Sequence, residues 1–362
     1  MNEQSTIVVA MSGGVDSSVA AALLVEQGYR VIGMMLRLWS EPGSEQSNTC
    51  CTPDSMALSR RIAAKLGIPF YSLDAKEQFR NEIVQYFIDE YAAGRTPNPC
   101  VVCNRQIKWG VLMEWAHALG ADYLATGHYA RLRMKDDGRI SLIKGIDESK
   151  DQSYMLCRLS QEDLQRSIFP LGNMTKSAVR ELAHIKGLAA ADRADSQDLC
   201  FLAHQDYRQF LIRNSPGVIH PGEIVDRDGQ VLGKHQGLAF YTIGQRKGLG
   251  ISSPVPLYVI EKDSIHNRLV VGEEQMLGAD TLVAEQFHWI SNNLPEEPFT
   301  ASVKIRYKAP EIHALVVPHQ DGKVSIQFEC PLRDITPGQW VVIYQGDECL
   351  GGGVIASERS IK

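Results

Sequence analysis

Short apolar runs alternate with helix-length amphipathic segments as far as residue 127. The apolar runs, which predict strands, are residues 7–11, 30–36, 70–73 and 123–126. The amphipathic segments, each followed by a glycine and predicting a helix, are residues 16–27, 54–66, 77–93 and 105–119. Strands that alternate with glycine-terminated helices are typical of a parallel sheet with crossover helices. The pattern therefore predicts an N-terminal α/β domain built on a doubly wound parallel sheet.

The pattern changes in the second half of the chain. Residues 129–145 predict a β-hairpin around Asp137-Gly138, and residues 176–186 predict a further helix. From residue 215 the predicted strands are short and separated by Gly, Pro and Asp-Gly turns, with a clear hairpin around Asp228-Gly229. This is typical of small β-rich domains. We predict domains at 1–210, 211–280 and 281–362, the last of them a β-barrel.

Composition narrows the class of protein. The chain has 362 residues, of which 44% are hydrophobic and 22% charged, and this excludes disordered, collagenous and coiled-coil classes. A net charge of -6 argues against indiscriminate nucleic-acid binding. The N-terminus lacks the pattern of a secretory signal, and the chain has no run of about 18 apolar residues. We therefore expect a cytoplasmic protein with no membrane partner.

The eight cysteines are scattered, which fits a reducing compartment. Cys157 and Cys330 lie within apolar runs, so we expect them to pack in the core.

The motif SGGVDSS, residues 12–18, follows the first predicted strand and opens the first predicted helix. Glycines let a backbone approach a phosphate, a helix N-terminus supplies N–H donors and a positive dipole, and serine hydroxyls add hydrogen bonds. The motif therefore predicts a cradle for phosphates. The alternative is an ordinary connection in which Asp16 or Ser17 caps the helix. The full string resembles the pyrophosphate loop of ATP pyrophosphatases, which adenylate a substrate oxygen and release pyrophosphate.

A second motif, TPNPCVVCN at residues 96–104, precedes the helix predicted from Arg105. Cys103 would then lie just before a helix N-terminus, where the dipole favours the thiolate, so a reactive cysteine is expected there. The alternative is half of a structural zinc site, completed by Cys50 and Cys51, Cys200 and His128.

Six motifs in one order carry a resemblance that runs essentially end to end. They are SGGVDSS, NPCVVCN, ATGHYA, KDQSYML, SQDLCF and GLAFYTIGQRKGLG. In all of them the chain resembles the tRNA-specific 2-thiouridylase family, which thiolates uridine 34 of the tRNA anticodon.

This resemblance implies a tRNA-uridine 2-sulfurtransferase. ATP, with Mg²⁺ offsetting charge, would convert the uridine O2 to an adenylate. Cys200 would hold the incoming sulfur as a persulfide, and Cys103 would attack it and leave a Cys103–Cys200 disulfide. The implied partners are tRNA, in particular the tRNAs for Lys, Glu and Gln, and a cysteine desulfurase or sulfur-relay protein.

The resemblance also assigns binding residues. The ATP contacts are Ala10, Met11, Ser12, Gly13, Gly14, Val15, Asp16, Ser17, Leu36 and Gly127. The residues that face the target base are Asn98, Pro99 and Cys100. The residues that touch the rest of the tRNA are Lys150, Asp151, Gln152, Arg306 and Tyr307. The alternation of Lys304, Arg306 and Lys308 further predicts one basic face of a strand.

Cys100 departs from the family pattern, because many relatives carry an aspartate there that is proposed as the general acid–base. That role passes to Asp198 or to water, or is dispensed with. Cys100, Cys103 and Cys200 would also suffice to hold a [4Fe-4S] cluster, an alternative to the favoured persulfide route. Two other functions stay open: a different ATP pyrophosphatase reaction, such as amidotransfer or ligation, and a non-enzymatic nucleotide-binding or zinc-stabilised tRNA scaffold.

Overall fold

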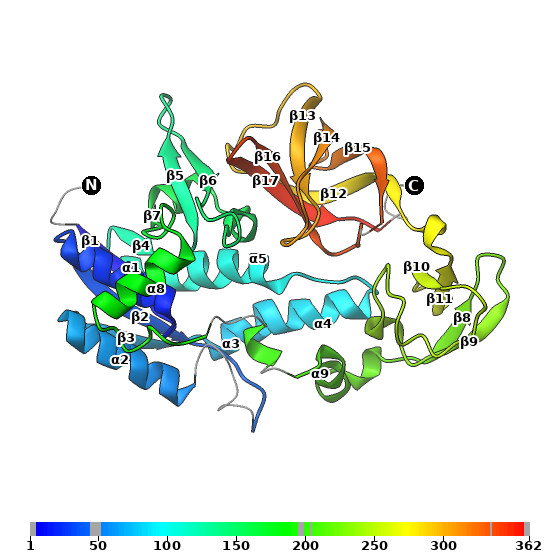
Figure 1. The fold of residues 1–362 in the computed structure, drawn as a ribbon, viewed down its shortest axis with the longest axis horizontal. Coiled ribbons are helices and arrows are strands. Elements are labelled where there is room, and N and C mark those ends of the chain that lie inside the picture. The colour runs from blue at the N-terminus through cyan, green and yellow to red at the C-terminus, as the bar shows by residue number, and fades with distance from the viewer. Residues whose placement is uncertain (1–4, 44–51, 195–198, 203–204, 334, 358–362) are drawn as a thin grey trace.

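A parallel sheet forms the N-terminal part of the fold, at the blue end of Figure 1. The computed structural model describes residues 5–43, 52–194, 199–202, 205–333 and 335–357. The strands of the sheet, in spatial order, are β3 (Phe70–Asp74), β2 (Arg30–Arg37), β1 (Thr6–Ala10), β4 (Tyr123–Ala125) and β7 (Ser167–Ile168). Strand β1 pairs in parallel with both β2 and β4, so the chain crosses over between strands.

Helices cover both faces of this sheet. They are α1 (Val15–Glu26), α2 (Pro53–Leu66), α3 (Lys76–Phe79), the π-helical η1 (Arg80–Val84), α4 (Gln85–Ala92), α5 (Pro99–Cys103), the π-helical η2 (Asn104–Leu112), α6 (Met113–Ala118) and α8 (Lys176–Ile185). Ile7 and Val9 of β1 pack in one core with α1 and α8, whereas Val8 packs in another with α3 to α6. Because side chains alternate along a strand, the two cores lie on opposite faces. The predicted doubly wound domain is confirmed.

The helix predicted from Arg105 begins earlier, and the expectation that Cys103 precedes a helix N-terminus is wrong. Helix α5 starts at Pro99, and the Asn98 side chain caps it by accepting a hydrogen bond from the Cys100 backbone N–H at 3.2 Å. The sequence pattern Asn-Pro fits this start, since asparagine is a favoured cap and proline a favoured first helical residue. Cys100 therefore occupies the first turn of the helix.

A small antiparallel sheet with one parallel pairing lies at the other end of the molecule (Figure 1). Its strands are β10 (Tyr258–Asp263), β11 (Arg268–Gly272), β8 (Gly222–Val225) and β9 (Val231–His235), in that spatial order. The predicted hairpin around Asp228-Gly229 is confirmed as β8 and β9. Helix α9 (Tyr207–Asn214) precedes this sheet.

The C-terminal strands close into a barrel. They are β12 (Ala279–Trp289), β15 (Val324–Leu332), β14 (Ile312–Pro318), β13 (Phe299–Lys304), β16 (Trp340–Gln345) and β17 (Glu348–Ile355), and β17 pairs back with β12. The predicted barrel is therefore confirmed. Short helical turns complete the fold: η3 (Ser153–Leu156), α7 (Gln161–Gln165), η4 (Cys200–Leu202), η5 (Pro216–Val218), η6 (Leu238–Phe240) and η7 (Glu274–Met276).

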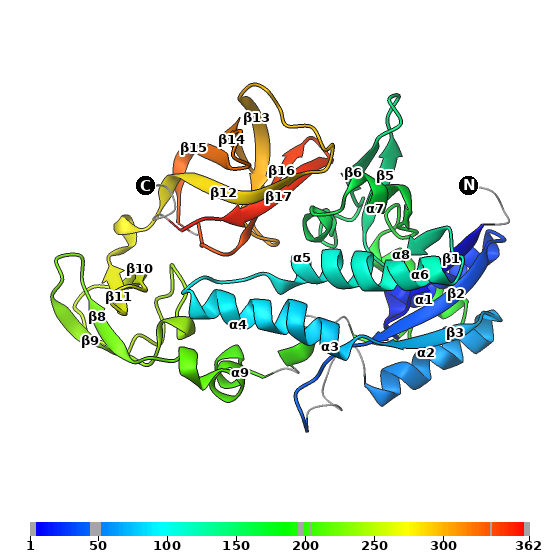
Figure 2. The ribbon, with the colours of Figure 1, turned by 180° about the vertical axis from the view of Figure 1, so that it is seen from behind.

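The predicted hairpin around Asp137-Gly138 is confirmed as β5 (Ala130–Met134) and β6 (Ile140–Lys144). It belongs to the barrel sheet, however, because β6 pairs antiparallel with β17. Both views in Figures 1 and 2 place the hairpin directly beside the barrel. A hairpin from the N-terminal part of the chain thus extends a sheet of the C-terminal part.

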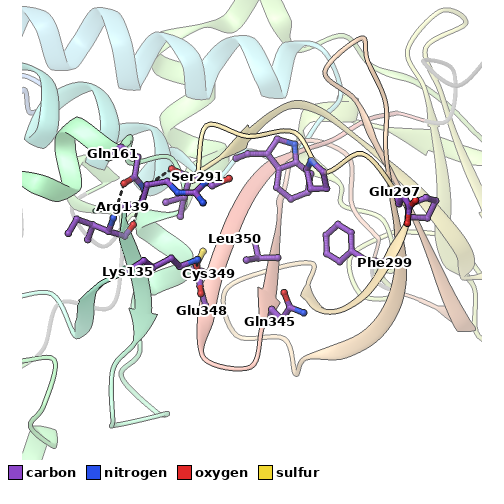
Figure 3. Close-up of a pocket in the computed structure, with 15 residues that line it drawn as sticks. Lys135, Arg139, Gln161, Ser291, Glu297, Phe299, Gln345, Glu348, Cys349 and Leu350 are labelled. Carbon is purple, nitrogen blue, oxygen red and sulfur yellow. Dashed lines mark hydrogen bonds and ion pairs between the residues drawn. The ribbon is translucent and has the colours of Figure 1, made fainter. Parts of the chain in front are cut away.

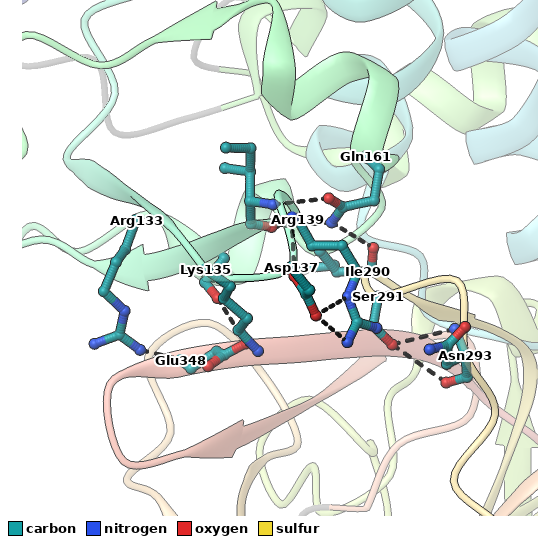
Figure 4. A network of polar contacts seen from close by, with 11 residues as sticks. Arg133, Lys135, Asp137, Arg139, Gln161, Ile290, Ser291, Asn293 and Glu348 are labelled. Atoms are coloured by element: carbon teal, nitrogen blue, oxygen red, sulfur yellow. Dashed lines mark hydrogen bonds and ion pairs between the residues drawn. The ribbon is translucent and has the colours of Figure 1, made fainter.

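Gln161 of α7 joins the hairpin to the barrel (Figure 4). Its Oε1 accepts a hydrogen bond from Ile140 N at 2.8 Å, and its Nε2 donates to Ile140 O at 2.9 Å and to Ile290 O at 2.8 Å. Nearby, His288 Nε2 lies 3.0 Å from Leu159 O. Burial lowers the pKa of His288, so this ring is neutral near pH 7 and donates its proton to that carbonyl.

Ion pairs and a cavity lie at the same junction. Glu348 pairs with Arg133 at 3.5 Å and with Lys135 at 2.6 Å. The cavity, of about 410 Å³, lies between the hairpin and the barrel, and Trp289 and Phe299 are among its lining residues (Figure 3). Because the Arg133 side chain is 63% exposed, its ion pair adds little stability, and the buried bonds of Gln161 matter more.

Of the two cysteines expected in the core, Cys157 is fully buried, but Cys330 is exposed. Strand β15 alternates buried and exposed residues as far as Phe328, and the pairing with β12 then shifts register, so Cys330 leaves the inward-facing series. Among the described residues, no helix combines the length and apolar character that crossing a bilayer requires.

Replacing Gln161 by Ala should lower the free energy of unfolding by about 1–3 kcal/mol, because three partly buried backbone groups lose their partner. Urea unfolding followed by tryptophan fluorescence measures the change. Gln165→Ala, at an exposed position of the same helix, is the matched control and should leave the midpoint unchanged. Identical unfolding midpoints for both variants would contradict the conclusion that Gln161 stabilises the junction of the hairpin and the barrel.

Candidate active site

The phosphate loop, residues 11–14, connects β1 to α1 at the carboxyl edge of the parallel sheet. Gly13 has φ +73°, and a Cβ there would lie 2.8 Å from the Ser55 backbone oxygen, so only glycine fits. The Ser17 hydroxyl accepts from Ser12 N at 3.2 Å and donates to Gly14 O at 3.2 Å. Gly14, the cap residue of α1, has no side chain to occupy the first N–H groups of the helix. This geometry fits an anion cradle.

Two cations that the motif does not contain flank this loop. Lys176 Nζ lies 2.7 and 2.8 Å from the two carboxylate oxygens of Asp16. Arg193 donates from Nη1 to Gly13 O at 3.1 Å and from Nη2 to Ser55 Oγ at 2.7 Å. Sequence reasoning missed both residues. Lys176 was detectable in principle, because a lysine at the first position of a helix opposes the helix dipole and calls for an anionic partner.

The ATGHYA motif follows β4 and packs against the phosphate loop. A Cβ on Gly127 would lie 2.8 Å from Ser17 N and 2.9 Å from Asp16 C, so the two backbones are in direct contact. The hydroxyl of Tyr129 donates to Asp16 Oδ1 at 2.8 Å. Leu36, the residue before the last in β2, lies at the same edge and is half-buried. The structure thus brings Gly127 and Leu36 to the edge of the sheet that carries the loop.

His128 is buried inside this motif. Its Nδ1 lies 2.7 Å from Thr126 Oγ1, and its Nε2 lies 3.3 Å from Lys108 Nζ. Burial, assisted by Lys108, holds the pKa of His128 well below its usual value, so the ring is neutral. Cys50 and Cys51, its suggested companions in a zinc site, lie outside the described residues.

The KDQSYML segment connects the phosphate loop to the barrel. Gln152 bonds Tyr129 in both directions: its Oε1 accepts from Tyr129 N at 3.0 Å, and its backbone N donates to Tyr129 O at 2.9 Å. Asp151 is 6% exposed, and its carboxylate accepts from Gly145 N, Ser153 N and Ser153 Oγ. The Asp151 side chain therefore holds this segment in place.

Aromatic side chains bring the barrel to the N-terminus of α5. The rings of Tyr154 and Tyr307 lie 5.9 Å apart. Burial raises the pKa of Tyr154 well above its usual value, while the Asn98 side chain and the Arg306 charge oppose that rise, so both lie near this phenol. Burial also raises the pKa of Tyr307 to about 12, with Asp151 and Cys100 adding to the effect.

The residues assigned to the target base and those assigned to tRNA thus gather in one region. The residues of this group, drawn from three distant parts of the chain, are Asn98, Cys100, Asp151, Gln152, Arg306 and Tyr307.

A second barrel loop clamps the segment before α5. Gln339 Nε2 donates to Thr96 O at 2.9 Å and to Pro97 O at 3.3 Å, and Thr96 N donates to Pro337 O at 2.9 Å. A Cβ on Gly338, whose φ is +89°, would lie 2.8 Å from Arg95 Cβ. The sequence carried no signal for this contact, because it joins residues that are far apart in the chain.

The prediction that Lys304, Arg306 and Lys308 share one face of a strand is wrong. Strand β13 ends at Lys304, and Arg306 and Lys308 lie exposed in a turn that closes with a bond from Ala309 N to Arg306 O at 3.1 Å. Residues 305–311 form the connection that turns the chain from β13 to β14 (Ile312–Pro318), so the three basic side chains do not alternate along one strand.

Cys103 and Cys200 are both half-buried and pack against the same hydrophobic core. Cys200 opens η4, and its neighbour Phe201 is buried against Phe87, with ring centroids 5.1 Å apart. By contrast, burial raises the pKa of the Cys157 thiol to about 12, so that thiol stays protonated near neutral pH. Asp198, the suggested acid–base, lies outside the described residues.

Within the described ranges no group of three or more His, Cys, Asp or Glu is arranged to hold a metal ion. Cys100, Cys103 and Cys200 therefore do not form the ligand set of a cluster in this geometry. Nor does Asp16 belong to a metal-binding group, since its carboxylate pairs with Lys176.

A parallel α/β sheet with this phosphate loop, followed by a small β domain and a barrel, defines a HUP-domain protein of the ATP pyrophosphatase class. Family models match the chain in three consecutive stretches. They are the tRNA methyl transferase HUP domain at residues 5–204, the tRNA methyl transferase PRC-barrel domain at 208–273 and the aminomethyltransferase beta-barrel domain at 279–355.

Full-length relatives narrow the assignment. The chain is 48% identical over 359 residues to tRNA-specific 2-thiouridylase MnmA 1 of Caldanaerobacter subterraneus, covering 98% of this chain and 99% of that one. It is 47% identical over 357 residues to tRNA-specific 2-thiouridylase MnmA of Magnetococcus marinus, covering 98% and 100%. The chain belongs to the tRNA-specific 2-thiouridylase family.

Replacing Gly127 by Ala should abolish most of the activity for which this family is named, because its Cβ would meet backbone atoms of Ser17 and Asp16 that cannot move without displacing the phosphate loop. Thiolation of tRNA, with circular dichroism to verify the fold, measures the effect. Gly217→Ala is the control, since nothing lies within 4 Å of its Cβ. A Gly127→Ala protein with the parent rate would show that the contact has no role.

Proposed function

We propose that the protein carries out ATP-dependent 2-thiolation of uridine 34 in the anticodons of the tRNAs for Lys, Glu and Gln. Membership of the family selects tRNA thiolation over the amidotransfer, ligation and scaffold functions that the sequence left open. One observation carries the assignment of the site. Gln152 bonds Tyr129, which bonds Asp16 in the helix turn that follows the phosphate loop, while the neighbouring Tyr154 contacts Tyr307 beside Cys100.

The first step activates the base. The uridine O2 attacks the α-phosphorus of ATP, a new O–P bond forms, and the bond to pyrophosphate breaks with its electron pair. Residues Ala10 to Ser17, which include the phosphate loop, hold the nucleotide, with Leu36 and Gly127 beside them. The N–H groups at the start of α1 face the phosphates and stabilise the charge that develops on the leaving group. Mg²⁺ enters, in this proposal, with the ATP.

The second step transfers sulfur. The terminal sulfur of a persulfide on Cys200 attacks C2 of the adenylated uridine, and AMP departs. The Cys103 thiolate then attacks Cys200 Sγ and breaks the S–S bond between Cys200 and the transferred sulfur. The products are 2-thiouridine in the tRNA and a Cys103–Cys200 disulfide in the protein. A thiol reductant restores both thiols, and a cysteine desulfurase or a sulfur-relay protein reloads Cys200.

The target base is placed by the start of α5. Asn98, Pro99 and Cys100 face it, because the cap at Asn98 and the clamp from Gln339 fix this turn. Cys100 stands in the position of an acid–base aspartate, and proton transfer passes to Asp198 or to water. An unstacked anticodon base is extruded toward this turn at modest cost.

The tRNA backbone contacts Lys150, Gln152, Arg306 and Tyr307 in this proposal. The buried carboxylate of Asp151 contributes by holding the backbone of its segment, so its contact with tRNA is made through main-chain atoms. The cytoplasm, where tRNA and ATP meet, is the proposed location.

Replacing Cys200 by Ser should prevent persulfide formation and thiolation. Cys103→Ser should still form the persulfide but stop with the transferred sulfur bonded to both Cys200 and the uridine, so that no free 2-thiouridine appears. Intact-protein mass spectrometry detects the added sulfur, and nucleoside analysis of the tRNA detects the product. Cys330→Ser, which removes an exposed thiol on the barrel, is the control and should retain full activity. Parent-level thiolation by either of the first two variants would refute the two-thiol mechanism.

Replacing Lys304 and Arg306 by Glu should weaken tRNA binding and make it less dependent on salt. Each lost phosphate contact reduces the steepness of the plot of log K against log salt by about 0.7–0.9. Filter binding across a salt series measures this. The double change Lys323→Glu with Arg333→Glu, elsewhere on the barrel, is the charge-matched control. Equal slopes for both double variants would remove the 304–306 turn from the tRNA interface.

A further inference from the structure

Lys176 is a nearly buried cation that lies beside the phosphate loop. It is the first residue of α8, where the helix dipole disfavours a cation, and it is only 9% exposed. Burying a lysine costs free energy unless the charge is paired. Its Nζ lies 2.7 and 2.8 Å from the two oxygens of Asp16, so the fold brings a cation to the first turn of α1.

Asp16 explains why such a cation is needed. Its carboxylate lies in the first turn of the helix that follows the loop, and a negative charge there opposes the arrival of phosphates. Lys176 neutralises this charge, and Tyr129 donates a second hydrogen bond to Oδ1 at 2.8 Å. Asp16 therefore keeps one hydrogen-bond donor even when Lys176 turns toward another anion.

Arg193 supplies a second positive charge, which contacts the loop at Gly13. Its guanidinium bonds the Gly13 carbonyl oxygen and the Ser55 hydroxyl, both of which are neutral groups. Lys176 and Arg193 thus place two positive charges beside the loop, with Asp16 paired to Lys176 Nζ and Asp147 accepting from the Lys176 backbone N at 2.8 Å. Two cations beside such a loop suit a polyphosphate.

We propose that Lys176 and Arg193 bind the β- and γ-phosphates of ATP and stabilise the departing pyrophosphate. This inference rests on the proposed function and adds two binding residues to it. As the bond between the α-phosphorus and the bridging oxygen breaks, its electron pair leaves with pyrophosphate. Both cations contact residues of the SGGVDSS motif, Lys176 at Asp16 and Arg193 at Gly13, so both lie close to where that added charge develops.

The test compares ATP and pyrophosphate, which contain the phosphates that these two residues would bind, with AMP, which lacks them. Isothermal titration measures binding of ATP, AMP and inorganic pyrophosphate to the full chain. Lys176→Gln and Arg193→Gln should each weaken binding of ATP and of pyrophosphate by about tenfold or more, because each removes a charge-assisted contact. AMP affinity should change less than twofold. Lys176→Arg, which keeps the charge, should retain most of the ATP affinity and guards against a loss that comes from misfolding.

Lys186→Gln is the matched control, because Lys186 forms an ion pair between the end of α8 and Glu26 of α1, away from the loop. It should alter none of the three affinities. Equal losses for ATP and AMP in the Lys176 and Arg193 variants would show a merely structural role, and unchanged ATP affinity would show no contact; either result overturns the inference. Failure of the parent protein to bind ATP and pyrophosphate would instead overturn the proposed function itself.

Discussion

The geometry of the site depends on the hydrogen bonds that the buried carboxylate of Asp151 accepts. A charge that is 6% exposed must be hydrogen-bonded, and this one accepts from Gly145 N at 3.0 Å, Ser153 N at 3.1 Å and Ser153 Oγ at 2.8 Å. Because Ser153 gives its only hydroxyl proton to Asp151, the Tyr344 hydroxyl donates to Ser153 Oγ across 3.2 Å. The carboxylate thus fixes the end of the hairpin, the KDQSYML segment and the barrel together.

This segment sets the geometry of both halves of the proposed reaction. On one side, Gln152 holds Tyr129 through two hydrogen bonds, and Tyr129 holds Asp16 at the phosphate loop. On the other side, Tyr154 donates to Trp340 O at 2.8 Å and packs on Tyr307. Neighbouring residues of the KDQSYML segment therefore position both the phosphate loop and the residues proposed to face the target base. A displacement of this segment would move both.

The sequence predicted what local patterns determine. Alternating apolar runs and glycine-terminated helices were sufficient for the parallel sheet, its crossover helices and both hairpins, since period and capping act over a few residues. The start of α5 was misplaced because the proline was interpreted as a loop signal, although it fits the first residue of a helix. Lys176, Arg193 and the Gln339 clamp were missed because each acts on residues distant in the chain, and the assignment of motifs to ATP and tRNA came from the resemblance.

The pairing of β6 with β17 has a consequence for synthesis of the chain. The hydrogen bond from Ser141 to Glu348 joins residues separated by 207 positions, so the N-terminal part reaches its final form only after nearly all of the chain has left the ribosome. Until then β6 is an unpaired strand edge, open to wrong partners. Arg131, Arg133 and Lys135 lie along the neighbouring strand and its turn. Charged side chains beside an unpaired strand disfavour its pairing with a second chain, and these three form ion pairs with Asp347 and Glu348 once β17 is in place.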